Sequence, residues 1–208
     1  MSISPIPASP VTAVSIATTS RNRIRKAWSS TNASTAAAPR ADYIIEILER
    51  DFDGYFNNVA GDRYPFTSPS AGIWGPKVMI INEMAGSGGD LMPYMFKRRK
   101  IGPLIGKRTW GGLVHTADTP PFIDGGSMIA PRGGFFTRDR KWAVENEGVA
   151  PDIDIENWPK EVIAGRDPQL ERAVQEAMRL LKERPVDRSP KEPPPPVWGQ
   201  RPRSGVNP

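Results

Sequence analysis

The chain has 208 residues, with 28 Lys and Arg against 23 Asp and Glu, a net charge of +5 and a pI near 9.6. A chain of this length can bury one core, and its scattered basic residues argue against nucleic-acid binding. It has no cysteine, which excludes disulfides and thiolate metal sites, and no apolar run reaches the ~18 residues that would span a membrane. Since the N-terminus also lacks a signal-peptide pattern, we expect a cytoplasmic protein without a nucleic-acid or membrane partner.

Both ends of the chain are poor in large apolar side chains. Residues 1–40 are rich in Ser, Thr, Ala and Pro, and residues 184–208 are rich in proline. Neither segment can bury enough apolar surface to offset the loss of chain entropy. We predict that both are disordered and that the folded unit covers residues 41–183.

The first half of this unit shows a helix, a loop, a strand and a second helix. Apolar residues at helical spacing predict a helix over 41–52, and the Gly- and Pro-rich stretch 55–76 predicts a long loop. The continuous apolar run 77–82 predicts a buried strand. After a glycine-rich turn, residues 91–100 predict a helix with a proline near its start, where proline is tolerated.

The second half predicts short strands followed by one long helix. Short segments with strand-like composition are separated by Gly, Pro and Asp, and this spacing favours β-hairpins. These segments are residues 103–110, 122–130, 134–137 and 141–145. Residues 167–183 predict the clearest helix, with Asp at its cap, Pro in its first turn and one apolar face. That face comprises Leu170, Ala173, Val174, Ala177, Leu180 and Leu181. The pattern is that of an α/β fold.

Ser87 lies in the glycine-rich turn between the buried strand and the helix that follows it. Small residues surround it in the sequence AGSGGD, as a sharp, exposed nucleophile turn requires. The Gly88 amide and the positive helix N-terminus could then stabilise an oxyanion. The alternatives are a plain glycine-rich turn or a phosphate-binding one.

Four ordered segments carry a resemblance to a known family. They are NEMAGSGGD, GPLIGKRTWGG, IDGGSMIAP and VENEGVAPDIDIE. In this order they resemble the catalytic domain of the tail-specific serine peptidases, and most closely its tricorn branch, from about Asp42 to about Leu181. The resemblance implies the C-terminal part of a crotonase/ClpP-like layered α/β domain, with peptide substrates, homo-oligomers and no cofactor or metal.

The resemblance assigns roles to individual residues. Ser87 matches the nucleophile, the Gly88 amide matches one oxyanion donor, and Glu145 matches the glutamate that orients the catalytic histidine through a serine. Glu147 is the nearest competitor of Glu145, which is preferred on motif position. The Arg108–Gly112 segment is expected to border the nucleophile, and Asp90 is expected to cap the helix after it.

The pattern breaks at the general base, which a serine nucleophile needs. The only histidine, His115, follows Ser87, whereas the family histidine lies far upstream of the nucleophile. We therefore expect His115 to be a loop or strand residue. A new dyad with Ser87 is the alternative.

The family glycine loop that supplies the other oxyanion amide is also missing. In its place the chain reads WSSTNASTAAAPRADYII. With TCN serine codons, reading residues 28–38 from each third base permits Leu-Val-Val-Asp-Glu-Arg-Phe-Asn-Gly-Gly-Gly, which matches the family motif D-x-R-x-N-G-G-G. Our hypothesis is that the residues up to about Pro39 are read out of frame, which the gene sequence would test.

The sequence therefore predicts a serine-type peptidase by family. It predicts a truncated fragment, weakly active or inactive, in which Ser87 forms the acyl-enzyme. A non-catalytic fragment that binds peptides or mediates oligomerisation is the alternative. An acyl-CoA enzyme of crotonase type would share the layering, but the RTWGG and VENEGVAPDI segments argue against it.

Overall fold

The computed structural model describes residues 33–57, 65–116, 120–185 and 191–194, with side chains described from residue 41 onward. Its elements are α2 (Ala33–Glu49), β1 (Gly54–Phe56), β2 (Phe66–Ser68), β3 (Met79–Ile81), α3 (Gly88–Arg98), β4 (Leu104–Gly106), β5 (Ile153–Asp154), α4 (Pro159–Ile163) and α5 (Pro168–Glu183). The predicted disorder of residues 1–32 and of most of the C-terminal tail lies outside the described residues.

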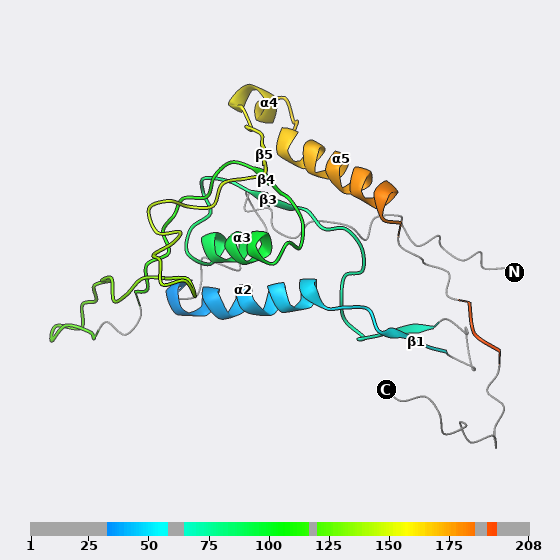
Figure 1. The fold of residues 1–208 in the computed structure, drawn as a ribbon. Helices are drawn as coiled ribbons and strands as arrows, with labels where there is room; N and C mark the ends of the chain where they lie inside the picture. Colours follow the sequence, from blue (N-terminus) through cyan, green and yellow to red (C-terminus); the bar gives the residue numbers. More distant parts are fainter. Residues whose placement is uncertain (1–32, 58–64, 117–119, 186–190, 195–208) are drawn as a thin grey trace, which may run out of the picture.

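A three-stranded parallel sheet in the order β3-β4-β5 forms the centre of the fold. Met79 pairs with Leu104, and Ile105 pairs with Ile153. Helix α5 lies on one face of the sheet, and α3 lies on the other face with α2 beyond it (Figure 1). The α/β class predicted from the sequence is confirmed.

The alternation of side chains along β3 divides the core between the two faces. Met79 and Ile81 join the cluster beneath α2 and α3, whereas Val78 and Ile80 join the cluster beneath α5. The first cluster comprises Ile45, Leu48, Met79, Ile81, Phe96, Leu104, Val144 and Val149. The second comprises Val78, Ile80, Ile105, Ala173 and Ala177. Burial on both faces explains why the sequence 77–82 is apolar without alternation.

Helix α2 begins at Ala33, not at residue 41 as predicted. The prediction of disorder was therefore wrong for residues 33–40. Alanine has the highest helix propensity, and the run 36–38 lets the helix extend upstream of its amphipathic part. The helix ends at Glu49, three residues before the predicted end.

The predicted strands were only partly correct. Residues 55–76 do not form one continuous loop, because β1 pairs antiparallel with β2. The segment 103–110 contributes β4, which pairs in parallel with β3 and does not form a hairpin. Residues 122–130 contain turns and no strand, whereas 134–137 and 141–145 meet at an antiparallel bridge between Phe136 and Trp142.

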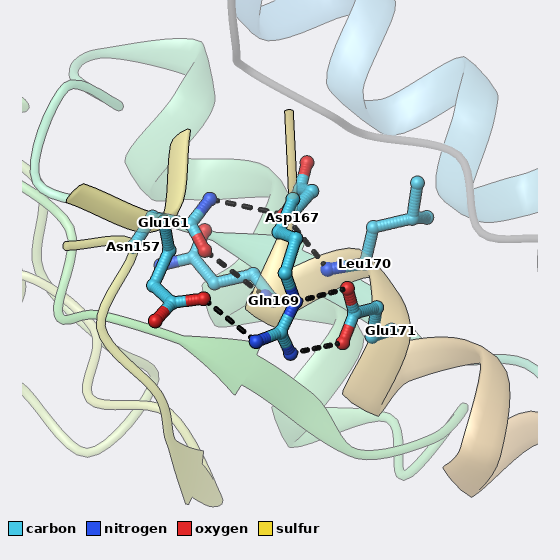
Figure 2. Close-up of polar contacts among 7 residues, drawn as sticks. Asn157, Glu161, Asp167, Gln169, Leu170 and Glu171 are labelled. Atoms are coloured by element: carbon cyan, nitrogen blue, oxygen red, sulfur yellow. Dashed lines mark hydrogen bonds and ion pairs between the residues drawn. The ribbon is translucent and has the colours of Figure 1, made fainter. Parts of the chain in front are cut away.

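The start of α5 is fixed to the chain that leaves β5 (Figure 2). The Asp167 carboxylate accepts hydrogen bonds from the Leu170 amide and from the Asn157 side chain, both at 3.0 Å. The Gln169 amide donates to Asn157 at 3.0 Å, and the Gln169 side chain donates to the Ile155 carbonyl at 2.9 Å. The predicted Asp cap is confirmed, and it also holds α5 against the sheet.

Candidate active site

Ser87 is the residue immediately before α3, at the end of the turn that follows β3. Its backbone has φ 54° and ψ −115°, and its side chain makes no capping hydrogen bond to the helix. A positive φ at a residue other than glycine is strained. The Ser87 amide donates to the Gly112 carbonyl at 2.9 Å, which helps to hold this conformation. The strand–turn–helix placement predicted for Ser87 is the one observed.

The Gly88 amide opens helix α3 without a hydrogen-bond partner in the described part of the chain. The next two amides are satisfied, because Gly89 donates to Gly86 at 2.8 Å and Asp90 donates to Ser87 at 2.9 Å. The first amides of a helix lack intrahelical acceptors and carry its positive partial charge. The Gly88 amide is therefore available to an anionic oxygen that forms beside Ser87.

The segment that follows β4 runs beside the Ser87 turn. The Trp110 amide donates to the Ala85 carbonyl at 2.8 Å. The indole covers Gly86 and Gly112, since a Cβ at either glycine would lie 2.6 Å from a ring carbon. The indole nevertheless remains 67% exposed. The expectation that residues 108–112 border the nucleophile turn is confirmed.

Asp90 is completely buried and binds this segment. Its two carboxylate oxygens accept hydrogen bonds from the Gly111 amide at 2.8 Å and the Gly112 amide at 3.0 Å. The expected role as a helix cap was wrong. Asp90 is the third residue of α3, and its side chain reaches away from the helix backbone to the neighbouring segment.

Glu145 lies in a tight loop that is hydrogen-bonded to the same segment. Its carboxylate accepts a hydrogen bond from the Leu113 amide. The Asn146 amide donates to the Gly111 carbonyl at 2.7 Å, which fixes the loop against residues 109–113. Glu147 is exposed, and its backbone carbonyl accepts a hydrogen bond from Arg108. Glu145, not Glu147, therefore has its carboxylate on the segment that holds Ser87.

His115 lies further along the chain from the same segment, with its side chain exposed. Its amide donates to the Gly133 carbonyl at 2.8 Å, and its carbonyl accepts from the Arg132 amide at 2.6 Å. It is thus a residue of an isolated antiparallel bridge. No hydrogen bond joins its imidazole to Ser87 or Glu145 in the described part of the chain.

Sequence reasoning missed two buried polar groups that support the site. They are the Asp90 carboxylate, in the role described above, and the Thr109 hydroxyl, which accepts the Val149 amide at 2.8 Å. Both bond to residues more than 20 positions away, and no local pattern signals such partners. Among the described residues, no group of His, Cys, Asp and Glu is arranged to hold a metal ion, and no helix is long and apolar enough to cross a membrane.

A serine on a strained strand-to-helix turn beside a free helix N-terminal amide is typical of a serine hydrolase. Residues 13–155 match the family described as Peptidase family S41. The chain therefore belongs to peptidase family S41 and is a serine-type peptidase by family. The match begins upstream of the boundary expected at residue 41.

The curated relatives are tricorn proteases. The chain is 39% identical over 139 residues to Tricorn protease from Thermoplasma acidophilum, covering 67% of this chain and 13% of that protein. It is 35% identical over 150 residues to Tricorn protease homolog 1 from Streptomyces coelicolor, covering 72% of this chain and 14% of that protein. The resemblance to the tricorn branch is confirmed.

A solved structure agrees with these sequence matches. The crystal structure of the tricorn protease aligns with a TM-score of 0.62 and 38% identity, over 69% of this chain and 14% of that chain. The 208 residues thus correspond to a small part of these much longer relatives.

Proposed function

We propose that the chain carries the nucleophilic part of a serine peptidase site, with Ser87 as the nucleophile. As the Ser87 Oγ attacks the carbonyl carbon of a peptide bond, its proton would pass to the general base, and the Gly88 amide would bind the resulting oxyanion. Collapse would release the amine with a proton from the general base and leave an acyl group on Ser87. Water would then attack this ester and release the acid. The observation that carries the proposal is the strained Ser87 turn beside the free Gly88 amide.

Glu145 is proposed to orient the catalytic imidazole, acting through a serine next to the histidine as in the family. Its support is position, because the carboxylate binds the Leu113 amide, one residue beyond the Gly112 carbonyl that holds Ser87. A carboxylate held in this way keeps a defined direction. Any histidine that it orients would therefore be placed relative to Ser87 by the same backbone segment.

We propose that the isolated chain hydrolyses peptides weakly or not at all. The only histidine of the sequence, His115, is bonded through its backbone to Gly133 and Arg132. The general base, and the second oxyanion donor that the family's glycine loop provides, would have to come from outside these 208 residues. The alternative is a non-catalytic fragment that binds peptides or mediates oligomerisation.

The remaining features of the proposal follow the family. The layering would be the crotonase/ClpP-like type, incomplete in this chain, and the full-length protein would form homo-oligomers in the cytoplasm and act on peptides. The α5–sheet–α3 arrangement in Figure 1 supports the layered fold.

Labelling of Ser87 with a fluorophosphonate at raised pH tests the proposal. Hydroxide can then take the serine proton in place of a general base, so that the turn and the Gly88 amide determine the rate. The label, located by mass spectrometry, is expected on Ser87 and lost in Ser87→Ala. Ser127→Ala, which removes an exposed serine from another glycine-rich turn, should not alter it. Labelling of Ser127 as fast as Ser87, or no labelling of Ser87, would remove Ser87 as the nucleophile.

A further inference from the structure

The buried Asp90 carboxylate is the point where three parts of the candidate site meet. It projects from the first turn of α3, three residues after Ser87, and no part of it is exposed to solvent. A buried charge is costly unless hydrogen bonds compensate it. Both oxygens of Asp90 are compensated by backbone amides, those of Gly111 and Gly112.

The amides that Asp90 holds belong to the segment that also holds Ser87 and Glu145. The Gly112 carbonyl accepts the Ser87 amide at 2.9 Å, and the next amide, that of Leu113, donates to the Glu145 carboxylate. The Gly111 carbonyl accepts the Asn146 amide from the Glu145 loop. Gly111 and Gly112 thus donate their amides to Asp90. Their carbonyls accept the amides of Asn146 and Ser87, which belong to the two loops.

We propose that Asp90 is a positioning residue that sets the placement of Ser87 relative to Glu145. The functional part of this inference rests on the proposed roles of those two residues. Asp90 touches neither side chain in this arrangement. It acts by clamping residues 111–112 against the first turn of α3, so that the nucleophile turn and the glutamate loop share one rigid support.

The geometry requires a carboxylate specifically. Two adjacent amides point at one side chain, and each is bonded to a different carboxylate oxygen, so that the two bonds keep this geometry only if both terminal atoms are acceptors. Asparagine would accept from one amide and turn its own NH₂ group toward the other. The charged acceptor also makes each hydrogen bond stronger than a neutral one, and its charge lies at the positive end of α3.

The test compares Asp90→Asn with Asp152→Asn in the 208-residue chain. Asp152 is the control, because its carboxylate also accepts a backbone amide of the sheet, that of Leu104 at 2.8 Å. It also forms an ion pair with Lys97 at 2.9 Å, in the last turn of α3 and so at the other end of that helix from Ser87. Amide hydrogen exchange is measured by NMR. In Asp90→Asn, exchange at Ser87 and Leu113 should accelerate by ~10-fold or more, because a charged hydrogen bond is lost from their support. In Asp152→Asn, the acceleration should be confined to the surroundings of Leu104 and Lys97, and exchange at Ser87 and Leu113 should not change.

Fluorophosphonate labelling at raised pH gives the functional readout. Asp90→Asn should slow labelling of Ser87 by about 10- to 100-fold, the cost of a small misplacement of reacting groups. Asp152→Asn should leave the labelling rate unchanged even if it lowers stability as much. A stability loss alone would slow both variants together.

The outcomes distinguish a failure of the positioning role of Asp90 from a failure of Ser87 as the nucleophile. Unchanged exchange at Ser87 and Leu113 in Asp90→Asn would overturn the positioning role. Accelerated exchange in a chain whose wild type is not labelled would support the clamp and refute Ser87 as nucleophile. If Asp90→Asn does not fold, Asp90→Glu carries the same comparison, since it keeps the charge and moves the carboxylate by one methylene.

Discussion

Strained backbone conformations concentrate around the candidate site. Ser87, Val144 and Asn146 all have positive φ, at 54°, 77° and 60°. Each such residue costs about 1–3 kcal/mol and persists only where its surroundings over-determine it. Here the surroundings are the hydrogen bonds of residues 109–113, which bind both the Ser87 turn and the Glu145 loop. The strain is therefore held by the segment that joins the two proposed site residues.

Gly148, the glycine of the Glu145 loop, should not tolerate a larger residue. Its φ is 65°, and a Cβ there would lie 2.1 Å from the Thr109 carbonyl oxygen, which is backbone and cannot move aside cheaply. We expect Gly148→Ala to lower the free energy of unfolding by about 2–5 kcal/mol, from left-handed strain and overpacking together. Urea denaturation measures the loss.

The control for this prediction is Gly125→Ala. Gly125 has φ 81° and no atom within 4 Å of a built Cβ, so only the conformational cost of about 1–2 kcal/mol applies. Equal losses in the two variants would show that the contact with Thr109 does not restrict the loop.

The sequence alone could predict the placement of a residue only where its neighbours lie close by in the chain. Ser87 was placed correctly because small residues, a strand and a helix flank it within a few positions. The role of Asp90 could not be predicted, since its partners lie 21 and 22 residues away and are backbone amides, which leave no trace in side-chain patterns. Glu145 was selected by resemblance alone, because its partner Leu113 is 32 residues away.

Among the secondary-structure elements, predictability followed length and periodicity. Helix α5 and strand β3 were recognised, because sixteen helical residues and a continuous apolar run are strong signals. Strands β1, β2 and β5 are no longer than β3, and unlike β3 they do not lie in a continuous apolar run. The parallel pairing of β3 with β4 depends on the α3 crossover and not on a local turn.

The apolar face predicted for α5 is wider than the face that the sheet covers. Ala173 and Ala177 are buried against the sheet, as expected. Leu170 and Val174 were predicted on the same face but are 39% and 48% exposed. The small alanines allow α5 to approach the strands closely, which leaves the neighbouring larger side chains at the rim of the contact.

Glu176 of α5 should make the stability of the chain depend on pH. The residue is 4% exposed, and hydrogen bonds from Arg179, followed by Arg172, lower the pKa of its carboxyl. Because the folded state then binds its proton less readily than the unfolded state, the stabilisation is present above the unfolded pKa of about 4.3 and is lost as the pH falls through the folded pKa.

We expect Glu176→Gln to be less stable than wild type at neutral pH and to lose less stability on acidification. Urea denaturation at a series of pH values from neutral to about 3 measures both effects. Glu183→Gln is the control, since Glu183 also binds Arg179 but is exposed. An unaltered pH profile in Glu176→Gln would assign the acid sensitivity to other carboxylates.

For the whole molecule, the sheet determines where the candidate site forms. Ser87 follows the carboxyl end of β3, and residues 109–113 follow the carboxyl end of β4, which lies next to it in the sheet. Ligands of open parallel α/β sheets bind outside the carboxyl ends of the strands. The fold thus brings the nucleophile turn, its supporting segment and the Glu145 loop to one edge, although about 60 residues separate the first from the last.

The molecule should nevertheless be a poor peptidase by itself. A serine without a general base keeps only the rate provided by the oxyanion site and by binding, which is several orders of magnitude below that of a complete triad. Turnover of fluorogenic peptides by the 208-residue chain is therefore expected to be barely above background and abolished by Ser87→Ala. His115→Ala should not change it, because the backbone of His115 is held at Gly133 and its side chain is exposed. Robust turnover that disappears in His115→Ala would establish a new dyad and overturn both the expected weakness and the loop role of His115.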